Sequence, residues 1–449
     1  MEISLLRMMM VDRCRLAVKD FLSHYGMYYE DNSAHDLFEG FFGEMDRGLA
    51  GQESSLKMIP TYLTDGREIA AGKPVIAMDI GGTNVRIATI SFDAAGNPEI
   101  GDYQTYPTPG IQEEISSDDF FRTVARYLRP VLDRSRLIGC CFSFATAPKA
   151  DKDATVIATG KQLKVRGLLG KNVAESLKAA LEEEQLGKDK RIIVLNDSVA
   201  AMLGGETVRG DRRFSGNIGF IFGTGTNVCY VEQNRNIGKI GNADPAGRMI
   251  INVESCGYSG FRRGEIDREF DAVLLDYGKD QFEKMVSGKY QGGLTLTAIK
   301  KAAADGLFSK AFGEHAALLQ DLSSREIDEF LNYPYGKNRL AQCCRAEAQG
   351  PRDDRRMLYD LIDALNERSA FLCAVVLGAV IFKAGIGSNP CLPAYVTAEG
   401  STFYRSKNFK DKLYYYVRTF LNRELGLYPE FFRVNDATLI GTGVAGLTN

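Results

Sequence analysis

Apolar and polar positions along the chain predict strands joined by tight turns. An apolar run at 75–78 leads into a glycine-rich turn at 79–84, and residues 85–90 then alternate apolar and polar side chains, as half-buried strands do. The same order returns at 218–231, where a turn of glycines and threonines separates two apolar segments. The pattern therefore predicts two strand–turn–strand hairpins far apart in the chain.

The two hairpins also share residues. The run Thr83-Asn84-Val85 recurs as Thr226-Asn227-Val228. Three identical residues alone are weak evidence for a repeat, but the shared strand–turn–strand context strengthens it. We therefore expect two related α/β domains, each opening with such a hairpin.

Helical patterns fill most of the remaining sequence. Apolar residues recur at steps of three and four within 13–50, and 259–384 is mostly helical by the same period. The longest apolar run, 370–382, has thirteen residues. A membrane span needs about 20, so we expect a buried helix there. Further strands are expected at 138–144 and 191–195, and further helices after 198 and at 436–447.

Composition and charge fit a soluble protein with a full core. The 449 residues are 45% apolar and 25% charged, which suits two or three domains. The net charge is −3 and no basic stripe stands out, so we expect no nucleic-acid partner. The apolar part of residues 1–12 is too short and too charged for a signal peptide. We also expect no membrane partner.

Cysteine and histidine usage narrows the chemistry. The nine cysteines are odd in number and never spaced Cys-x-x-Cys, which argues against a disulfide framework and a zinc site and favours a reducing cytoplasm. Only three histidines occur, and His24 and His35 precede every motif. A general base in this chain is therefore expected to be a carboxylate.

The first hairpin carries residues suited to phosphate binding. Glycines let backbone N–H groups approach phosphate oxygens closely, Thr and Asn add side-chain donors, and Arg adds positive charge. Asp79 ends a predicted strand, where it could hold through water the Mg²⁺ that bridges the phosphates. The competing interpretation is a plain turn, which the full eight-residue pattern disfavours. The candidate residues are Asp79, Gly81, Gly82, Thr83, Asn84 and Arg86.

Two further segments complete the predicted site. The turn Gly223-Thr224-Gly225 is weak evidence alone, but opposite the first hairpin it would clamp a nucleotide from both lobes. Asn196-Asp197 follows a buried strand, so the carboxylate would face the crevice at the strand ends. It could accept the proton of a substrate hydroxyl, or it could simply cap the next helix, and both roles can coexist.

Together these segments resemble the eukaryotic-type hexokinase and glucokinase family. The similarity runs from about residue 38 to the C-terminus, and the motifs follow the family's order. The matching segments are 58–62, 79–86, 142–144, 196–198, 223–232, 252–254, 282–285 and 399–401. The resemblance implies an α/β fold of two actin-like ATPase (ribonuclease H-like) lobes with a cleft between them. The small lobe would comprise 60–195 plus 436–449, and the large lobe 1–59 plus 196–435.

The resemblance also implies ATP-dependent phosphorylation of the 6-hydroxyl of a hexose, with glucose expected first and mannose or fructose after it. Asp197 would be the general base. The residues that would contact the sugar are Ser143, Lys161, Asn196, Asn227, Glu254 and Glu283. Those that would contact ATP and its Mg²⁺ are Asp79, Gly81, Gly82, Thr83, Asn84, Arg86, Gly223, Thr224, Gly225 and Ser401.

Several departures from the family pattern leave the sugar preference open. Ala145 stands where the family has Pro, Gly160-Lys161 replaces a Thr-Lys pair, and 255–259 replaces an aromatic segment after Glu254. Three alternatives remain: a non-catalytic sugar sensor, an actin-like filament ATPase, and a kinase for another hexose or an amino sugar. A sensor should have lost Asp197, and a filament ATPase would not need the sugar-facing residues. Oligomeric state, feedback regulation and the role of the first forty residues stay open.

Overall fold

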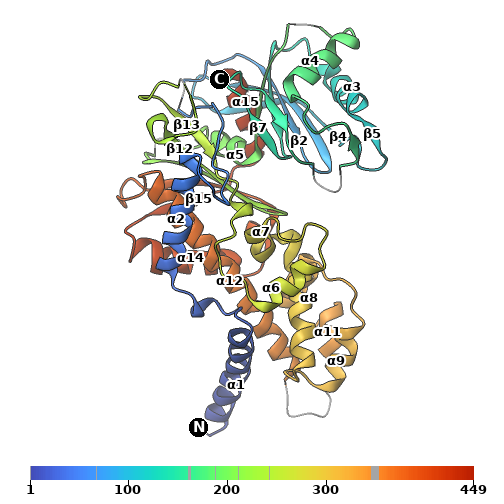
Figure 1. Ribbon diagram of the computed structural model, residues 1–449, viewed down its shortest axis with the longest axis vertical. Helices are drawn as coiled ribbons and strands as arrows, with labels where there is room; N and C mark the ends of the chain where they lie inside the picture. The colour runs from blue at the N-terminus through green and yellow to red at the C-terminus, as the bar shows by residue number, and fades with distance from the viewer. Residues whose placement is uncertain are drawn as a thin grey trace.

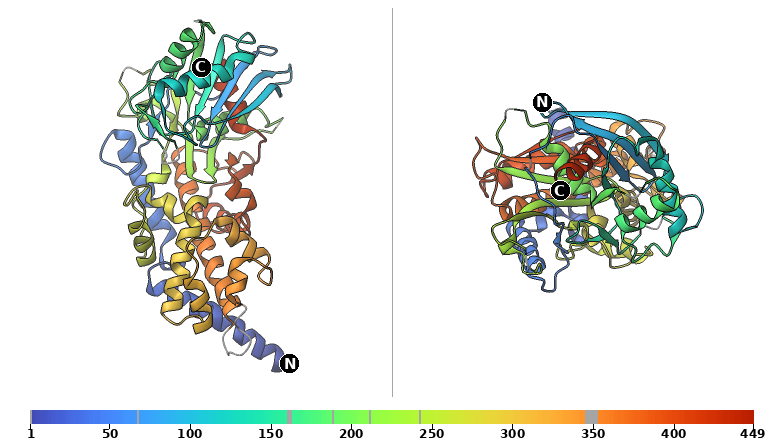
Figure 2. Two further views of the ribbon diagram at one scale, coloured as in Figure 1. Left: turned by 90° about the vertical axis from the view of Figure 1, so that its right-hand side faces the viewer. Right: turned by 90° about the horizontal axis from the view of Figure 1, so that it is seen from above.

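The computed structural model describes residues 2–66, 68–159, 163–187, 189–210, 212–241, 243–344 and 353–449. Two β-sheets occupy one end of the molecule and a long helical part occupies the other (Figure 1). The N-terminal helix α1 (Glu2–His24) projects from the helical end. Figure 2 shows the same elongated arrangement from a second side.

A five-stranded sheet forms the centre of the small lobe, in the order β10-β6-β2-β3-β4. Its strands are β2 (Val75–Ile80), β3 (Asn84–Phe92), β4 (Pro98–Pro107), β6 (Leu137–Phe142) and β10 (Arg191–Leu195). The first three strands pair antiparallel, and β6 and β10 add parallel to β2. Alternate residues of β2 enter different cores: Ile76 and Met78 pack with helices α3 (Ser117–Leu128) and α4 (Val173–Glu183), and Ala77 packs with α15 (Ala437–Thr448).

The large lobe repeats this plan. Its sheet has the order β1-β13-β12-β11-β14-β15, with the first hairpin strands antiparallel and two later strands added parallel. The strands are β1 (Ile59–Pro60), β11 (Gly216–Phe222), β12 (Thr226–Gln233), β13 (Arg248–Asn252), β14 (Ala394–Glu399) and β15 (Pro429–Phe432). The repeat of β11-β12-β13-β14-β15 on β2-β3-β4-β6-β10 confirms the predicted pair of related α/β domains.

Two helices cross between the sheets. Helix α5 (Asp197–Glu206) packs on the large-lobe sheet, and α15 packs on the small-lobe sheet. Glycines bring their backbones into contact: a Cβ at Gly204 would lie 2.1 Å from the oxygen of Ala437, and one at Gly441 would lie 1.8 Å from the oxygen of Ala200. Side chains of both helices and both sheets share one buried cluster. The start of α5 is therefore fixed against both lobes.

Helices on the far side of the large-lobe sheet form the rest of the molecule. They are α2 (Ala34–Ala50), α6 (Glu265–Ala272), α7 (Gln281–Val286), α8 (Gly288–Ala304), α9 (Lys310–Ala317), α10 (Ser324–Asn332), α11 (Arg339–Cys343), α12 (Asp354–Lys383), α13 (Ser401–Arg405) and α14 (Phe409–Tyr416). This confirms the helical prediction for 259–384. Among the described helices α12 alone is long and apolar enough to cross a membrane, but 89% of its apolar stretch is buried inside the protein. The predicted buried helix at 370–382 is thus confirmed.

Short elements complete the fold. Two small sheets flank the five-stranded sheet, one from β5 (Ile115–Ser116) and β9 (Val165–Arg166), the other from β7 (Thr146–Pro148) and β8 (Ala154–Val156). Short 3₁₀ turns lie at Tyr29–Asp31, Arg129–Val131, Asn234–Asn236 and Ser255–Gly257, and α14 continues into a π-helical segment at Val417–Asn422. The exact residues at which one lobe passes into the other stay a prediction.

Candidate active site

Asp197 is the first residue of α5, directly after the buried strand β10. Asn196 is the N-cap residue, because its Oδ1 accepts hydrogen bonds from the amide and the hydroxyl of Ser198 at 3.0 and 2.8 Å. Asp197 Oδ1 also accepts a bond from the Ser198 amide, at 2.8 Å. Since Asn196 caps the helix, capping does not account for a carboxylate at the next position.

The environment of Asp197 disfavours its charge. Burial, followed by the nearby carboxylates of Asp79 and Glu254, raises the pKa of Asp197 from 3.8 to about 7, against backbone hydrogen bonds that lower it. Asp79 comes from the small lobe, at the end of β2, and Glu254 from the large lobe, just after β13. The fold therefore gathers carboxylates from both lobes around a group that can exchange its proton near neutral pH.

Four polar side chains form a connected network beside Asp197. The side-chain nitrogen Nδ2 of Asn227 donates to Asn252 Oδ1 at 2.8 Å and to Glu254 Oε1 at 3.3 Å. It also lies 3.4 Å from Asn196 Oδ1. Asn252 Nδ2 donates in turn to Glu254 Oε1 at 2.8 Å. These contacts fix which way each amide points. The network thus presents pre-oriented donors and acceptors to a polyhydroxyl ligand.

Glu254 is held in an unusual backbone conformation. Its φ and ψ are 56° and 48°, in the left-handed region that residues with a Cβ rarely adopt. Such a residue costs of order 1–3 kcal/mol and persists where its surroundings hold it, which is common at functional sites. Lys57 Nζ lies 4.0 Å from Glu254 Oε2.

Glu283, on α7, reaches the second hairpin. Its Oε2 accepts a hydrogen bond from the Thr226 amide at 3.1 Å. Burial, with smaller contributions from Asp280 and Glu254, raises the pKa of Glu283 to about 7, against the lowering effect of the Thr226 amide. Glu254 and Glu283 are therefore close enough to influence each other although they come from separate segments.

The first hairpin leaves open space at its tip. Gly82, Thr83 and Asn84 are exposed, and a Cβ added at Gly82 would meet no protein atom within 4 Å. Gly82 does not adopt a positive φ either. Neither packing nor backbone conformation therefore requires a glycine at this position, whereas close approach of a ligand to the backbone would.

Asp79 and Arg86 face each other across the antiparallel strands β2 and β3. Arg86 Nε and Nη2 both donate to Asp79 Oδ2, at 3.0 and 2.5 Å, and Nη2 also donates to Thr438 Oγ1 at 2.8 Å. Arg86 Nη1 lies 3.4 Å from Asp436 Oδ1. The arginine thus ties the first hairpin to the start of α15, contacts that the sequence reasoning did not anticipate.

The donor set around Asp79 suits magnesium that arrives with a nucleotide. No group of three or more His, Cys, Asp or Glu that could hold a metal ion occurs within the described ranges. Mg²⁺ commonly binds through one or two carboxylates while phosphates and waters complete its shell. One carboxylate, 6% exposed at the foot of a glycine hairpin, fits that arrangement.

The second hairpin rests on two helix starts. The oxygen of Gly223 accepts hydrogen bonds from Gly288 N and Thr402 Oγ1, both at 2.9 Å, and Thr224 accepts one from Lys289 N at 3.1 Å. Gly400 has a φ of 116°, and a Cβ there would lie 2.3 Å from the oxygen of Phe222. This close approach places Ser401, the first residue of α13, beside the hairpin.

Ser143 and Lys161 are the other two residues that the sequence predicts to contact the sugar. Ser143 follows β6 and is half-buried, with its Oγ 3.9 Å from Cys141 Sγ. Lys161 lies outside the described residues. Asn252 joins two predicted sugar contacts but received no role from the sequence, although it stands two residues before Glu254 in one of the matching segments. Its place within that matching segment was the available signal.

Comparisons with known proteins agree with this arrangement. Two family models, both described as Hexokinase, match residues 18–207 and 217–448. Rat Hexokinase-2 is 27% identical over 454 residues, which cover 96% of this chain and 48% of the relative. Human Hexokinase HKDC1 is 28% identical over 378 residues, which cover 80% of this chain and 40% of the relative. The chain thus spans about half the length of the curated relatives it matches.

Solved structures share the fold. The hexokinase from Schistosoma mansoni complexed with glucose superposes with a TM-score of 0.77 at 22% identity, covering 98% of this chain and all of its own. A second hexokinase crystal structure gives 0.69 at 19% identity, with 96% and 95% covered. These likenesses confirm the α/β fold of two actin-like ATPase lobes.

Proposed function

Because this chain belongs to the hexokinase family, we propose that it transfers the γ-phosphoryl group of ATP to the 6-hydroxyl of a hexose. The observation that carries the proposal is Asp197, a carboxylate with a pKa near 7 at the start of a helix held by both lobes, beside the network of Asn227 and Glu254. Glucose is the expected acceptor. The ATP is expected to enter as its Mg²⁺ complex, with Asp79 nearest the metal.

Asp197 supplies the base in this reaction. As the hydroxyl oxygen forms its bond to the γ-phosphorus, the bond from that phosphorus to the bridging oxygen breaks, and the hydroxyl proton passes to Asp197. A carboxylate with a pKa near 7 is well matched to a reversible proton transfer at neutral pH. The electron pair of the broken bond leaves with ADP.

The remaining site residues orient the two substrates and balance the charge of the phosphates. The amide network of Asn196, Asn227 and Asn252, with Glu254 and Glu283, supplies fixed donors and acceptors for the sugar hydroxyls. Backbone amides of the first hairpin, with Thr83 and Asn84, are exposed where phosphates could approach. Such preorganised dipoles lower the barrier because they need not reorient during the reaction.

A sugar panel tests the proposal. The purified chain, ATP and Mg²⁺ are incubated with glucose, mannose, fructose, galactose and glucosamine, and ADP release is followed. Glucose should turn over, and galactose, inverted at carbon 4, should fall at least about tenfold in kcat/KM because buried polar groups are left unpaired. ADP release that does not depend on any sugar would favour a simple ATPase, and sugar binding without turnover would favour a sensor.

We also place this reaction in the cytoplasm. None of the nine cysteines forms a disulfide in the structure, and six of them are buried. Unpaired thiols suit a reducing compartment. Locating a tagged chain in its native cell would test this placement.

A further inference from the structure

Helix α7 carries Glu283 on one side and a buried lysine on another. Glu283 bonds the Thr226 amide of the second hairpin, whereas the neighbouring residue Lys284 is only 4% exposed. The helix has six residues. So short a helix has little stability of its own, and its neighbours must set its orientation.

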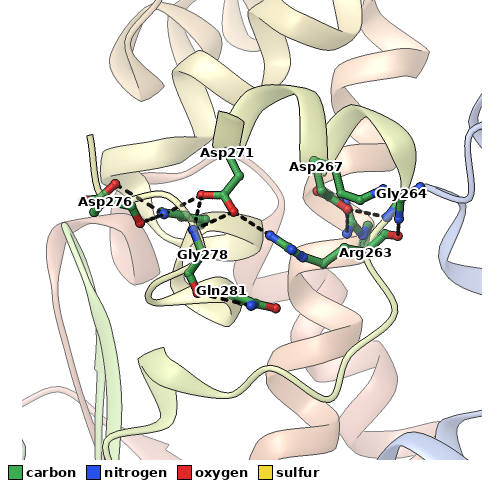
Figure 3. Close-up of polar contacts among 10 residues, drawn as sticks. Arg263, Gly264, Asp267, Asp271, Asp276, Gly278 and Gln281 are labelled. Atoms are coloured by element: carbon green, nitrogen blue, oxygen red, sulfur yellow. Dashed lines mark hydrogen bonds and ion pairs between the residues drawn. The ribbon is translucent and has the colours of Figure 1, made fainter. Parts of the chain in front are cut away.

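Lys284 is held by groups from α6 and from the loop between the two helices. Its Nζ donates to Asp271 Oδ1 and to the backbone oxygen of Asp276, each at 2.6 Å. Asp271, 1% exposed, also accepts from Arg263 Nη1 at 2.7 Å and from the Gly278 amide at 3.1 Å. Figure 3 shows Asp271 between the Gly278 loop and Arg263. The network ties both ends of the loop to α7.

Stability alone does not account for this network. Replacing a buried ion pair by apolar residues is often neutral or stabilising, so such pairs are weak evidence for stability. Burial alone would raise the pKa of Asp271, but hydrogen bonds from Lys284 and Arg263 outweigh it and hold the pKa below its usual value. Asp271 therefore stays ionised at neutral pH, and the hydrogen bonds that it accepts have fixed directions.

Most other contacts of α7 are apolar. Two hydrogen bonds add to them, one from Phe282 N to the oxygen of Tyr258 at 3.1 Å and one from Gln291 Nε2 to the oxygen of Met285 at 3.0 Å. Phe282, Met285 and Val286 are buried in the large-lobe core. Apolar burial stabilises their position but is non-directional, so it leaves the rotation of the helix about its axis less sharply defined. The polar anchor at Lys284 is adjacent in sequence to Glu283, so a small rotation there would move the carboxylate relative to Thr226.

We propose that Lys284 and Asp271 are positioning residues that hold Glu283 against the second hairpin and thereby set the affinity for the sugar. The proposal rests on the proposed function, in which Glu283 contacts the hexose. Neither residue touches the sugar; both act through the orientation of α7. Removing the anchor should therefore weaken sugar use while leaving nucleotide use largely unchanged.

The same helix α6 offers a matched control. One turn before Asp271, Asp267 pairs with Arg368 Nη1 at 2.9 Å and accepts from the Gly264 amide at 2.8 Å. Asp267 and Arg368 are 4% exposed, like Lys284. This pair joins α6 to α12 and does not reach α7. Lys284→Met and Arg368→Met each remove one buried cation and leave the aspartate another partner.

The test compares the two variants by sugar KM, ATP KM, kcat and melting temperature. We expect Lys284→Met to raise the glucose KM by about tenfold or more, the size of a weakened hydrogen bond to a charged group, with an ATP KM within about twofold. Arg368→Met should lower the melting temperature similarly but leave the glucose KM within about twofold. If Lys284→Met does not fold, Asp271→Asn, which keeps an acceptor for Lys284, should raise the glucose KM by a smaller factor.

A double-mutant cycle with Glu283→Gln makes the result decisive. If Lys284 acts through Glu283, Lys284→Met should add little to the glucose KM once Glu283 is already changed. Equal effects of Lys284→Met and Arg368→Met on the glucose KM, or effects additive with Glu283→Gln, would overturn the positioning role while the proposed function stands. If wild type phosphorylates no hexose, or Glu283→Gln leaves the glucose KM unchanged, the proposed site itself fails and the positioning role falls with it.

Discussion

Replacing Asp197 by asparagine should make the protein inactive yet more stable. Burial and two neighbouring carboxylates raise the pKa of Asp197 from 3.8 to about 7 in the folded protein. The folded state therefore binds the proton more tightly than the unfolded chain does. The free energy of unfolding of wild type therefore falls as the pH rises from about 4 to about 7. Asparagine never ionises, so the variant does not lose this stability.

The magnitude follows from the same shift. Each pKa unit corresponds to about 1.4 kcal/mol, so the rise from 3.8 to about 7 corresponds to roughly 4 kcal/mol as an upper value. The side chain of Asp197 is only partly buried, so solvent screening reduces the cost and we expect about 1–4 kcal/mol. Asn196 remains to cap α5, so the helix start survives the change.

The assay follows unfolding of both proteins by denaturant at about pH 4.5 and pH 8, without sugar or nucleotide. Asp197→Asn should gain most of its advantage at pH 8 and little at pH 4.5, while kcat falls by roughly 10²–10⁴-fold, the usual range for losing a general base. A variant that is less stable than wild type at pH 8, or whose advantage does not change with pH, would refute the burial reasoning. A variant that retains more than a tenth of kcat would remove Asp197 from the mechanism.

Three further predictions concern the sugar contacts, the glycines and the metal. Glu254→Ala and Glu283→Ala should each raise the glucose KM far more than the ATP KM in steady-state assays, and changes confined to ATP would place the sugar site elsewhere. Gly82→Ala should raise the ATP KM with an unchanged melting temperature, because its Cβ meets no protein atom, whereas Gly441→Ala should cost about 1–3 kcal/mol of stability or more, because its Cβ would overlap a helix backbone. Asp79→Ala should raise the Mg²⁺ concentration needed for half-maximal rate but keep glucose binding measurable by calorimetry, and turnover unaffected by EDTA would contradict this role.

The sequence predicted the elements whose signals are local. Strand β2 is buried on both faces and appears in the sequence as a continuous apolar run before a glycine turn, so its place in the chain could be predicted directly. The strand continues to Ile80, two residues beyond the predicted run at 75–78, and so includes Asp79. The second hairpin has the same signal. Because both hairpins have the same strand–turn–strand order, the presence of two related α/β domains could also be predicted from the sequence.

Contacts between distant segments could not be predicted in the same way. Arg86 was expected to face phosphates, and the structure pairs it with Asp79 and with Asp436 and Thr438, some 350 residues later in the chain. No local pattern encodes that the last helix starts beside the first hairpin. The anchor of Lys284 on Asp271 was not predicted for a similar reason: no local pattern encodes the packing of α6 against α7 that buries both residues.

The charges in the cleft link sugar binding to ionisation. Asp197 and Glu283 both have pKa values raised to about 7, and each is raised in part by Glu254. Hydroxyl groups that donate hydrogen bonds to a carboxylate favour its ionised form and lower its pKa. A bound hexose would therefore complete the ionisation that burial opposes, so that Asp197 becomes a competent base mainly when an acceptor is present. On the proposed function, the raised pKa values of Asp197 and Glu283 would thus favour transfer to sugar over transfer to water.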